Sequence, residues 1–313
     1  MKRLLSLLAG VAILALIYWR VDLDRLVDTL RNSSPYWLML GLAMVVPLTL
    51  FSAWRLQQLT PSGRSLGFTH AVRLILAASG LNMILPSKMG DIAKAAFMER
   101  DGHLEGPLAL SLVVFEKATD MLALLVWCLF GLIVYPNKDW MFWSLTGLIG
   151  VGLALTVLML SSGGFARLFF GAFNRAAPGK IRQKLARLEE SWLEMLRHLS
   201  QNGRLAARVL VMSVFIWFLH LLQVWFFILS LRAWPPLLAN LALAPLAILV
   251  GLLPFTFAGI GTRDAAVVFF YQPFLSAPVA AALGVLFTLR YLVPAIAGLP
   301  FLGRYMAEIP SFR

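Results

Sequence analysis

The sequence predicts an all-α polytopic membrane protein with about six transmembrane helices and two re-entrant hairpins that form a weak inverted repeat. Hydrophobic residues make up 60% of the 313 residues, charged residues make up 13%, and the mean hydropathy is +0.81. A water-soluble domain of this length could not cover so much apolar surface. Backbone N–H and C=O groups must be paired in hydrocarbon, and the apolar runs are too long for barrel strands, so we expect helices.

Six apolar runs are long enough to cross a bilayer core about 30 Å thick. They are Leu4–Trp19, Tyr36–Ala53, Leu108–Tyr135, Trp140–Leu160, Leu205–Leu231 and Ala277–Leu302. Two positive charges precede the first run, as in a signal peptide, but no cleavage site of small residues follows it. We therefore expect an uncleaved first span.

The charges of the connections predict the orientation. The segment from Phe165 to Arg208 carries nine Lys or Arg residues against three Glu residues, so the positive-inside rule makes it cytoplasmic. Following the six crossings from this segment puts both termini in the cytoplasm of what we expect to be a bacterial inner membrane. The net charge of +12 is then explained by cytoplasmic loops near anionic headgroups, and we expect no nucleic-acid partner.

Two further apolar segments do not fit as single crossings in this topology. They predict re-entrant hairpins near residues 71–98 and 237–271, the first entered from the cytoplasm and the second from outside. Each has a Leu-Pro pair followed by glycine, an Asp and an Ala-rich helix. The expected turn residues are Pro86, Gly90, Pro254, Gly259 and Gly261. Paired broken segments of opposite orientation are typical of secondary transporters.

We expect a single integral membrane domain over residues 1–313. Its parts are a first half (1–160), a cytoplasmic amphipathic segment (161–204) and a second half (205–313). Apolar residues between Lys180 and Leu199 recur at helical spacing opposite a basic face. This pattern is typical of a helix lying on the cytoplasmic leaflet, although a helix packed on its own protein has the same stripe.

Lys88, Asp91 and Lys94 follow the first Leu-Pro pair at a spacing of three residues. On a helix this spacing puts the three side chains near one face. They are candidates for a lipid headgroup site, in which Lys contacts a phosphate and Asp contacts an amine or pairs with Lys. The alternative is an ordinary cytoplasmic helix start with a solvated charged face.

Glu116, Lys117 and Asp120 lie inside an apolar run, and the two acids share one face of a helix. Each charge within a span costs about 2.5–3.5 kcal/mol on insertion scales, so such residues usually face the protein interior or a cavity. We therefore expect a functional or interior role. The alternative is that the start of this span is still in the headgroup zone and its side chains snorkel to water.

The second Leu-Pro pair is followed by "GIGTRD", which contains Arg263 and Asp264. Arg263 is a candidate phosphate contact because its guanidinium is a planar fork, and an internal pair with Asp264 that fixes the hairpin is the alternative. Arg290 is a lone cation deep in the last span. Arg290 is a candidate contact for the lipid headgroup, and the alternative is a salt bridge to Asp264, Glu116 or Asp120.

Several function classes have no support in the sequence. There is no Walker phosphate loop, no zinc-protease "HExxH" and no "GxSxG". The four His residues show no metal-ligand spacing, and the single Cys128 excludes an internal disulfide. We therefore assign no catalytic residue, expect no cofactor and no metal, and find no positive indication of an enzyme.

Four motifs carry a resemblance to a known family. "LPSKMGDIAKAAFMER", "FEKATDML", "LPFTFAGIGTRDAAVVFFY" and "LRYLVPAIAG" resemble, in this order, motifs of the lysylphosphatidylglycerol synthase transmembrane-region family, also called flippase-like. The resemblance covers nearly the whole chain. It implies movement of a lipid between leaflets, best described in the family for aminoacylated phosphatidylglycerol. It implies no synthase activity, because the aminoacyl-transfer domain is not in the sequence. The family commonly has Glu at the position of Asp264.

We expect a lipid translocase that moves an anionic or aminoacylated phospholipid or glycolipid by alternating access around the two hairpin tips. The headgroup would enter a polar cavity bounded by the charged residues of the spans and hairpins. Without an ATP site, movement would be downhill or ion-coupled. Two alternatives remain: an intramembrane lipid-modifying transferase with Asp91 or Glu116 as base, and a non-transporting partner of a cell-envelope lipid or glycolipid synthase. The sequence does not predict the oligomeric state.

Overall fold

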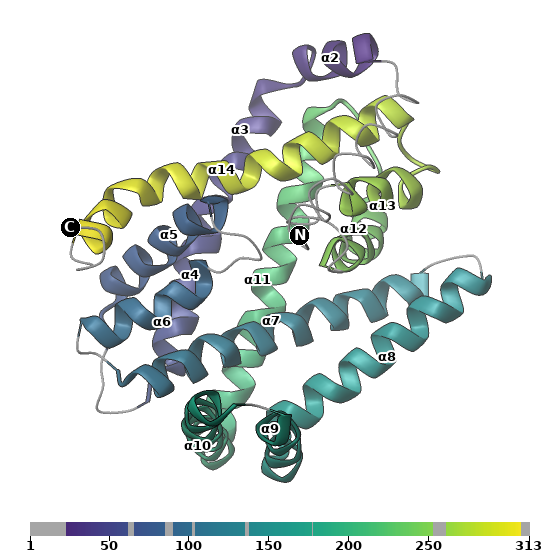
Figure 1. Cartoon of the computed structure of the whole chain (residues 1–313). Helices are drawn as coiled ribbons and strands as arrows, with labels where there is room; N and C mark the ends of the chain where they lie inside the picture. The colour runs from purple at the N-terminus through teal and green to yellow at the C-terminus, as the bar shows by residue number, and fades with distance from the viewer. Residues whose placement is uncertain are drawn as a thin grey trace.

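The computed structural model describes residues 23–61, 66–84, 90–101, 104–134, 138–176, 178–252 and 261–307. The regular elements within these ranges are α-helices (Figure 1), which confirms the predicted all-α class. They are α2 (Leu23–Arg31), α3 (Pro35–Ala43), α4 (Val45–Leu59), α5 (Phe68–Ile84), α6 (Gly90–Arg100), α7 (Gly106–Val134), α8 (Trp140–Ser161), α9 (Gly163–Ala176), α10 (Gly179–Gln201), α11 (Gly203–Ser230), α12 (Leu237–Leu252), α13 (Thr262–Phe270) and α14 (Ala277–Ala307).

Five helical stretches in the described ranges are long and apolar enough to cross a membrane. They are Pro35–Leu59, which joins α3 and α4, then α7, α8, α11 and residues Ala277–Leu302 of α14. These stretches coincide with five of the six predicted crossings. The sixth prediction, Leu4–Trp19, lies outside the described residues. At about 1.5 Å per residue α7 is about 43 Å long, which exceeds the hydrocarbon core of a bilayer.

The two segments predicted as hairpins fold as pairs of short helices. In the first half α5 packs against α6, and in the second half α12 packs against α13. The two helices of each pair are separated in the sequence by a segment that contains the Leu-Pro pair. These segments, 85–89 and 253–261, include residues outside the described ranges, and the predicted turn residues Pro86, Pro254 and Gly259 and the candidate Lys88 are among them.

The buried apolar side chains form two large cores. The first core surrounds α5 and α6 and includes the first half of α7 and much of α10. The second core surrounds α12 and α13 and includes the second half of α7 and the first half of α14. Figure 1 shows the two helix pairs at opposite sides of the molecule, with α7, α11 and α14 running between them. The long helices therefore connect two halves, each built around one helix pair.

Small residues allow the helices of each half to approach closely, as is common between helices in membranes. A Cβ atom on Gly298 of α14 would overlap the carbonyl oxygen of Leu76 on α5. A Cβ atom on Gly131 of α7 would likewise overlap the carbonyl oxygen of Ala242 on α12. Gly150 of α8 is different, because a Cβ atom there would meet no other atom within 4 Å.

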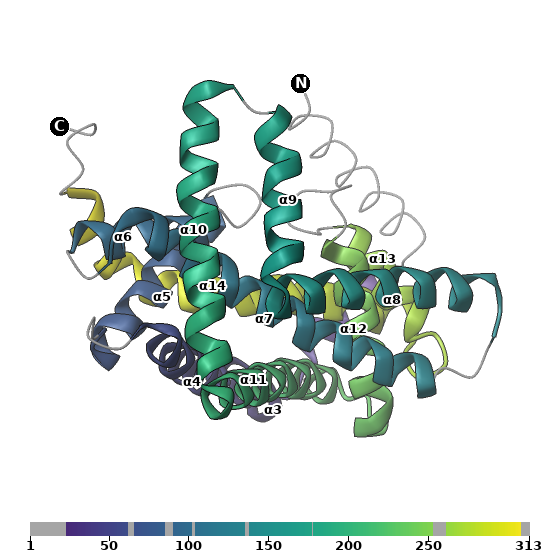
Figure 2. The same cartoon turned by 90° about the horizontal axis from the view of Figure 1, so that it is seen from below.

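The amphipathic segment forms α9 and α10, which run roughly at right angles to α7 and α8 (Figure 2). The apolar stripe predicted for residues 180–199 is buried over its second half, where Trp192 and Met195 are at most 1% exposed within the first core. Phe115 of α7 contacts the Trp192 ring at 5.3 Å between centroids. This part of α10 therefore packs on the protein itself, which was the alternative interpretation of the stripe.

The close contact at Gly298 generates a stability prediction. We expect Gly298→Ala to destabilise the protein by about 1–3 kcal/mol, because the added methyl group meets backbone rather than a movable side chain. Thermal unfolding of the detergent-solubilised protein measures this as a lower Tm. The matched control is Gly150→Ala, for which we expect an unchanged or slightly higher Tm, because Ala has the higher helix propensity. Equal Tm values for the two variants would contradict the packing described here.

Candidate functional site

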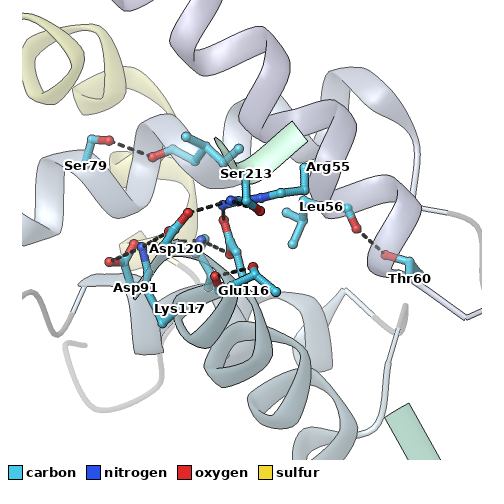
Figure 3. A network of polar contacts seen from close by, with 12 residues as sticks. Arg55, Leu56, Thr60, Ser79, Asp91, Glu116, Lys117, Asp120 and Ser213 are labelled. Atoms are coloured by element: carbon cyan, nitrogen blue, oxygen red, sulfur yellow. Dashed lines mark hydrogen bonds and ion pairs between the residues drawn. The ribbon is translucent and has the colours of Figure 1, made fainter. Parts of the chain in front are cut away.

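Arg55 is the centre of a polar network that joins α4 to α7 and α11. Its guanidinium is 2% exposed and donates to Asp120 at 2.5 Å, to Glu116 at 3.2 Å and to the hydroxyl of Ser213 at 2.9 Å (Figure 3). Glu116 and Asp120 lie one helical turn apart on α7, as their spacing predicts. Both carboxylates therefore converge on the same guanidinium.

Two lysines extend the network to α6. The Nζ atom of Lys94 lies 2.6 Å from Glu116 and 3.7 Å from Asp91, its neighbour on α6. The Nζ atom of Lys117 lies 3.0 Å from Asp91 and 3.6 Å from Asp120. We call Arg55, Asp91, Lys94, Glu116, Lys117 and Asp120 the ion-pair network. It contains three cations and three anions, so its formal charge is zero.

The ion-pair network has a buried centre and an open edge. The side chains of Lys94 and Glu116 are 3% exposed, whereas those of Asp91, Asp120 and Lys117 are 15%, 22% and 45% exposed. Lys94 and Lys117 both lie near the carboxylate of Asp91, so the charges at this edge of the network are paired with one another.

The start of α6 is pressed against α5, and this position brings Asp91 and Lys94 to α7. A Cβ atom on Gly90 would overlap the carbonyl oxygen of Ala78 and would come within 2.8 Å of two atoms of Asn82. Glycine is therefore required for this approach. Because Lys94 is buried in ion pairs, it does not lie on the solvated helix face that was the alternative for this segment.

Sequence reasoning missed Arg55 and Ser213. Arg55 follows the predicted crossing Tyr36–Ala53, a position at which an arginine is commonly found at the cytoplasmic membrane surface. One signal was present: α7 carries two acids and one base within its apolar run, so the interior needs a further cation. Arg55 lies at the end of another span and is suited to supply it.

A second polar cluster lies at the start of α13. Arg263 donates to Oδ1 of Asp264 from Nη2 at 2.9 Å and from Nε at 3.2 Å. The Oδ2 atom of Asp264 accepts from the backbone N–H of Gly261 at 2.9 Å, and Gly261 has a φ of 95° that favours glycine. A Cβ atom on Gly284 of α14 would lie 2.9 Å from Oδ1 of Asp264. The internal Arg–Asp pair that was one interpretation of "GIGTRD" is therefore present and fixes the start of α13.

Arg290 lies on α14 beside this cluster and is 6% exposed. Its guanidinium lies over the rings of Tyr291 and Phe287, at 4.7 and 5.4 Å from their centroids, and donates to the Tyr291 hydroxyl at 2.9 Å. The guanidinium of Arg263 lies over the same Phe287 ring, at 4.9 Å. The two cations are thus neighbours around one aromatic side chain.

Arg290 has no carboxylate partner in the described part of the chain. Its Nη1 atom is buried and makes no hydrogen bond with any described residue. The salt bridge to Asp264, Glu116 or Asp120 that was the alternative for Arg290 is not found among the described residues. We call Arg263, Asp264 and Arg290 the second cluster. It contains two cations and one anion, so one positive charge is uncompensated among the described residues.

The candidate residues therefore lie in two groups, one beside each helix pair. No ion pair or hydrogen bond joins the ion-pair network to the second cluster within the described ranges. A search of the same residues finds no group of three or more His, Cys, Asp or Glu arranged to hold a metal ion.

Known membrane proteins resemble this chain over nearly its whole length. The family described as "Lysylphosphatidylglycerol synthase TM region" matches residues 3–298. This match confirms the resemblance found in the four sequence motifs. The chain is also 26% identical to a UPF0104 membrane protein of Methanocaldococcus jannaschii, over 94% of this chain and 92% of the relative. No solved structure matches the chain.

The ion-pair network generates a test by paired substitutions. We expect Lys94→Met to destabilise the protein by about 3–5 kcal/mol, because it removes the nearest cation from the buried Glu116. Adding Glu116→Gln should recover part of this loss, so the double variant should cost less than the two single variants together. The free energy of unfolding of the two single variants and of the double variant is measured by chemical unfolding, with tryptophan fluorescence as the signal.

The control is Lys117→Met, at the open edge of the same network. Because Lys117 is 45% exposed, we expect its loss to cost less than about 1 kcal/mol. Strictly additive effects of Lys94→Met and Glu116→Gln would show that these two side chains do not interact as described.

Proposed function

Because the chain belongs to the lysylphosphatidylglycerol synthase TM region family of integral membrane proteins, we propose that it moves a lipid with a phosphate-bearing headgroup between the two leaflets. The headgroup is anionic or aminoacylated, and the acyl chains stay in the bilayer. The proposed membrane is a bacterial inner membrane, with both termini in the cytoplasm.

The observation that carries this proposal is that Arg290 has no anionic partner among the residues that the structure describes. A charged side chain within a span costs about 2.5–3.5 kcal/mol on insertion scales, and such residues usually have a partner or face a polar pathway. Arg290 is buried in a candidate span, and its Nη1 atom has no hydrogen-bond partner in the described part of the chain. A phosphate group would complete this site, because a guanidinium binds phosphate oxygens with two parallel charge-assisted hydrogen bonds.

Arg263 supports the same assignment. Its guanidinium already pairs with Asp264, yet it lies over the Phe287 ring that Arg290 also contacts. An anion bound to Arg290 would therefore lie in the field of a second cation. The single carboxylate of Asp264 is shared with the backbone N–H of Gly261 and cannot neutralise both guanidinium groups.

The helix pairs supply the moving parts in this proposal. We propose that α5–α6 and α12–α13 are re-entrant hairpins entering from opposite sides, as an inverted repeat with its tips toward the membrane midplane. Two observations support this: the pairs lie in different cores at opposite sides of the molecule, and α12, with 16 residues, is shorter than a crossing requires (Figure 1). Both α6 and α13 have an Asp in the first turn, next to the positive end of the helix dipole.

The two groups of charges have different roles in this mechanism. The ion-pair network is neutral without a ligand, so it holds α4, α6 and α7 together while its open edge faces the pathway. At that edge Asp91 and Asp120 would contact the amine of an aminoacylated headgroup. Lys88, which lies outside the described residues, is a further candidate contact for its phosphate. The second cluster needs an anion to become neutral, so it would bind the phosphate on the opposite side of the pathway.

A non-transporting partner of an envelope-lipid synthase is the second candidate. The internal pairing of the ion-pair network and of Arg263 with Asp264 favours it, because these contacts would also serve a purely structural role. This candidate requires that the protein tolerate removal of the charge at Arg290. The intramembrane transferase requires a chemically altered lipid product.

Lipid scrambling in liposomes tests the proposal. Purified protein is reconstituted with fluorescent anionic, zwitterionic or polyprenyl-phosphate lipids, with and without a proton gradient. We expect one class to cross and Arg290→Ala to slow its crossing by at least about tenfold, because loss of one partner of a buried charge pair costs several kcal/mol. Asp91→Ala should also slow the crossing of an aminoacylated lipid.

The matched control is Arg197→Ala, an exposed arginine on α10, which should scramble like the wild type. Size-exclusion profiles and Tm values establish that each variant is folded. Failure of every lipid class to cross would contradict translocation and favour the partner subunit. A lipid recovered with a changed mass would favour the transferase.

A further inference from the structure

Helix α9 carries an exposed apolar face that no other described element covers. Leu168, Phe169 and Phe173 are 67%, 42% and 55% exposed. At 3.6 residues per turn these side chains fall on one side of the helix. The adjacent side of the helix is used for packing, because Ala166 and Phe170 are buried and Phe170 contacts Trp192 of α10. The exposed face is therefore additional to the surface that holds α9 on the protein.

The position of α9 relates this face to the membrane. One residue, Ser162, separates α9 from the end of α8, which is a candidate span. Only 11% of the most apolar window of α8 is buried, so α8 lies on the outside of the helix bundle, where a span faces lipid. Figure 2 shows α9 roughly at right angles to α8 and α7. If those helices cross the bilayer, α9 runs along its surface.

The charge of the surrounding sequence points to the chemistry of that surface. Residues 163–188 contain six basic residues and no Asp or Glu: Arg167, Arg175, Lys180, Arg182, Lys184 and Arg187. Arg167 and Arg175 are exposed on α9 itself, beside the apolar face. Aromatic and aliphatic side chains flanked by arginines are the composition of helices that lie in the boundary between anionic headgroups and acyl chains.

We propose that α9 lies in the membrane interface of the leaflet where α8 ends. Leu168, Phe169 and Phe173 enter the boundary of the acyl chains, and the neighbouring arginines bind anionic headgroups. This assigns the interfacial role to α9, whereas the apolar stripe of α10 is buried over its second half against the protein. The inference is independent of lipid transport, because an anchored α9 would equally fix the end of α8 in a partner subunit.

Depth measurement by spin labelling tests this proposal on the whole protein. Cys128 is buried and is replaced by Ala to remove the background thiol. A label is then attached at Phe173→Cys, and in a second variant at Leu168→Cys, in nanodiscs containing anionic lipid. We expect frequent collisions with oxygen and few with a water-soluble nickel complex, as for a label about 5–10 Å into the headgroup and acyl boundary.

The control label at Glu190→Cys lies on an exposed position of the neighbouring α10. It should collide often with the nickel complex and less often with oxygen. If the labels on α9 meet the nickel complex as often as this control, the face is in water and the proposal is wrong. Poor access to both collision partners would also overturn it, since protein, either a second copy or another part of this chain, would then cover the face.

Lipid composition tests the choice of partner. In nanodiscs of purely zwitterionic lipid, we expect access of the nickel complex to the label at Phe173→Cys to rise at least twofold, since the attraction of the basic residues is lost. If access of the nickel complex to this label does not change, anionic headgroups are not the partner of α9.

Discussion

A charge buried among apolar helices must be neutralised, and this constraint organises the first half of the molecule. Arg55 of α4 lies between Glu116 and Asp120 of α7, and Lys94 of α6 completes the pairing of Glu116. Removing any one of these groups leaves another charged group without one of its partners. The short helix α6 therefore has a defined position on α7, and the helices of the first core are held by charge as well as by packing.

In the second half of the molecule, the buried charges are only partly neutralised by the described residues. Arg263 and Asp264 form a closed pair at the start of α13, but Arg290 remains without an anion within the described residues. Under the proposed function, the headgroup supplies the missing negative charge when it binds and removes it when it leaves. A site already neutral in the empty state gains little from the ligand, whereas a site with one unpaired cation is completed by it. The proposed phosphate site follows from this contrast between the two clusters.

Properties that depend on nearby residues were predictable from the sequence. Five crossings followed from length and hydropathy, and the shared face of Glu116 and Asp120 followed from their spacing. Pairings between distant elements were not predictable. The bond from Arg55 to Asp120 spans 65 residues and depends on how α4 crosses α7. The sequence offered three acids as salt-bridge partners for Arg290, and only the structure shows that none of the three forms this bridge. The exposed apolar face of α9 was not predicted, because α10 has the longer apolar stripe.

Cryo-electron microscopy of the protein in nanodiscs that contain its native lipids tests the central claim most directly, at a resolution that shows the Arg290 side chain. We predict headgroup density within about 3 Å of the Nη1 atom of Arg290, consistent with a charge-assisted hydrogen bond to a phosphate oxygen. A carboxylate or carbonyl of the chain itself bonded to Nη1, with no lipid density beside it, would contradict the claim that Arg290 is completed by a ligand.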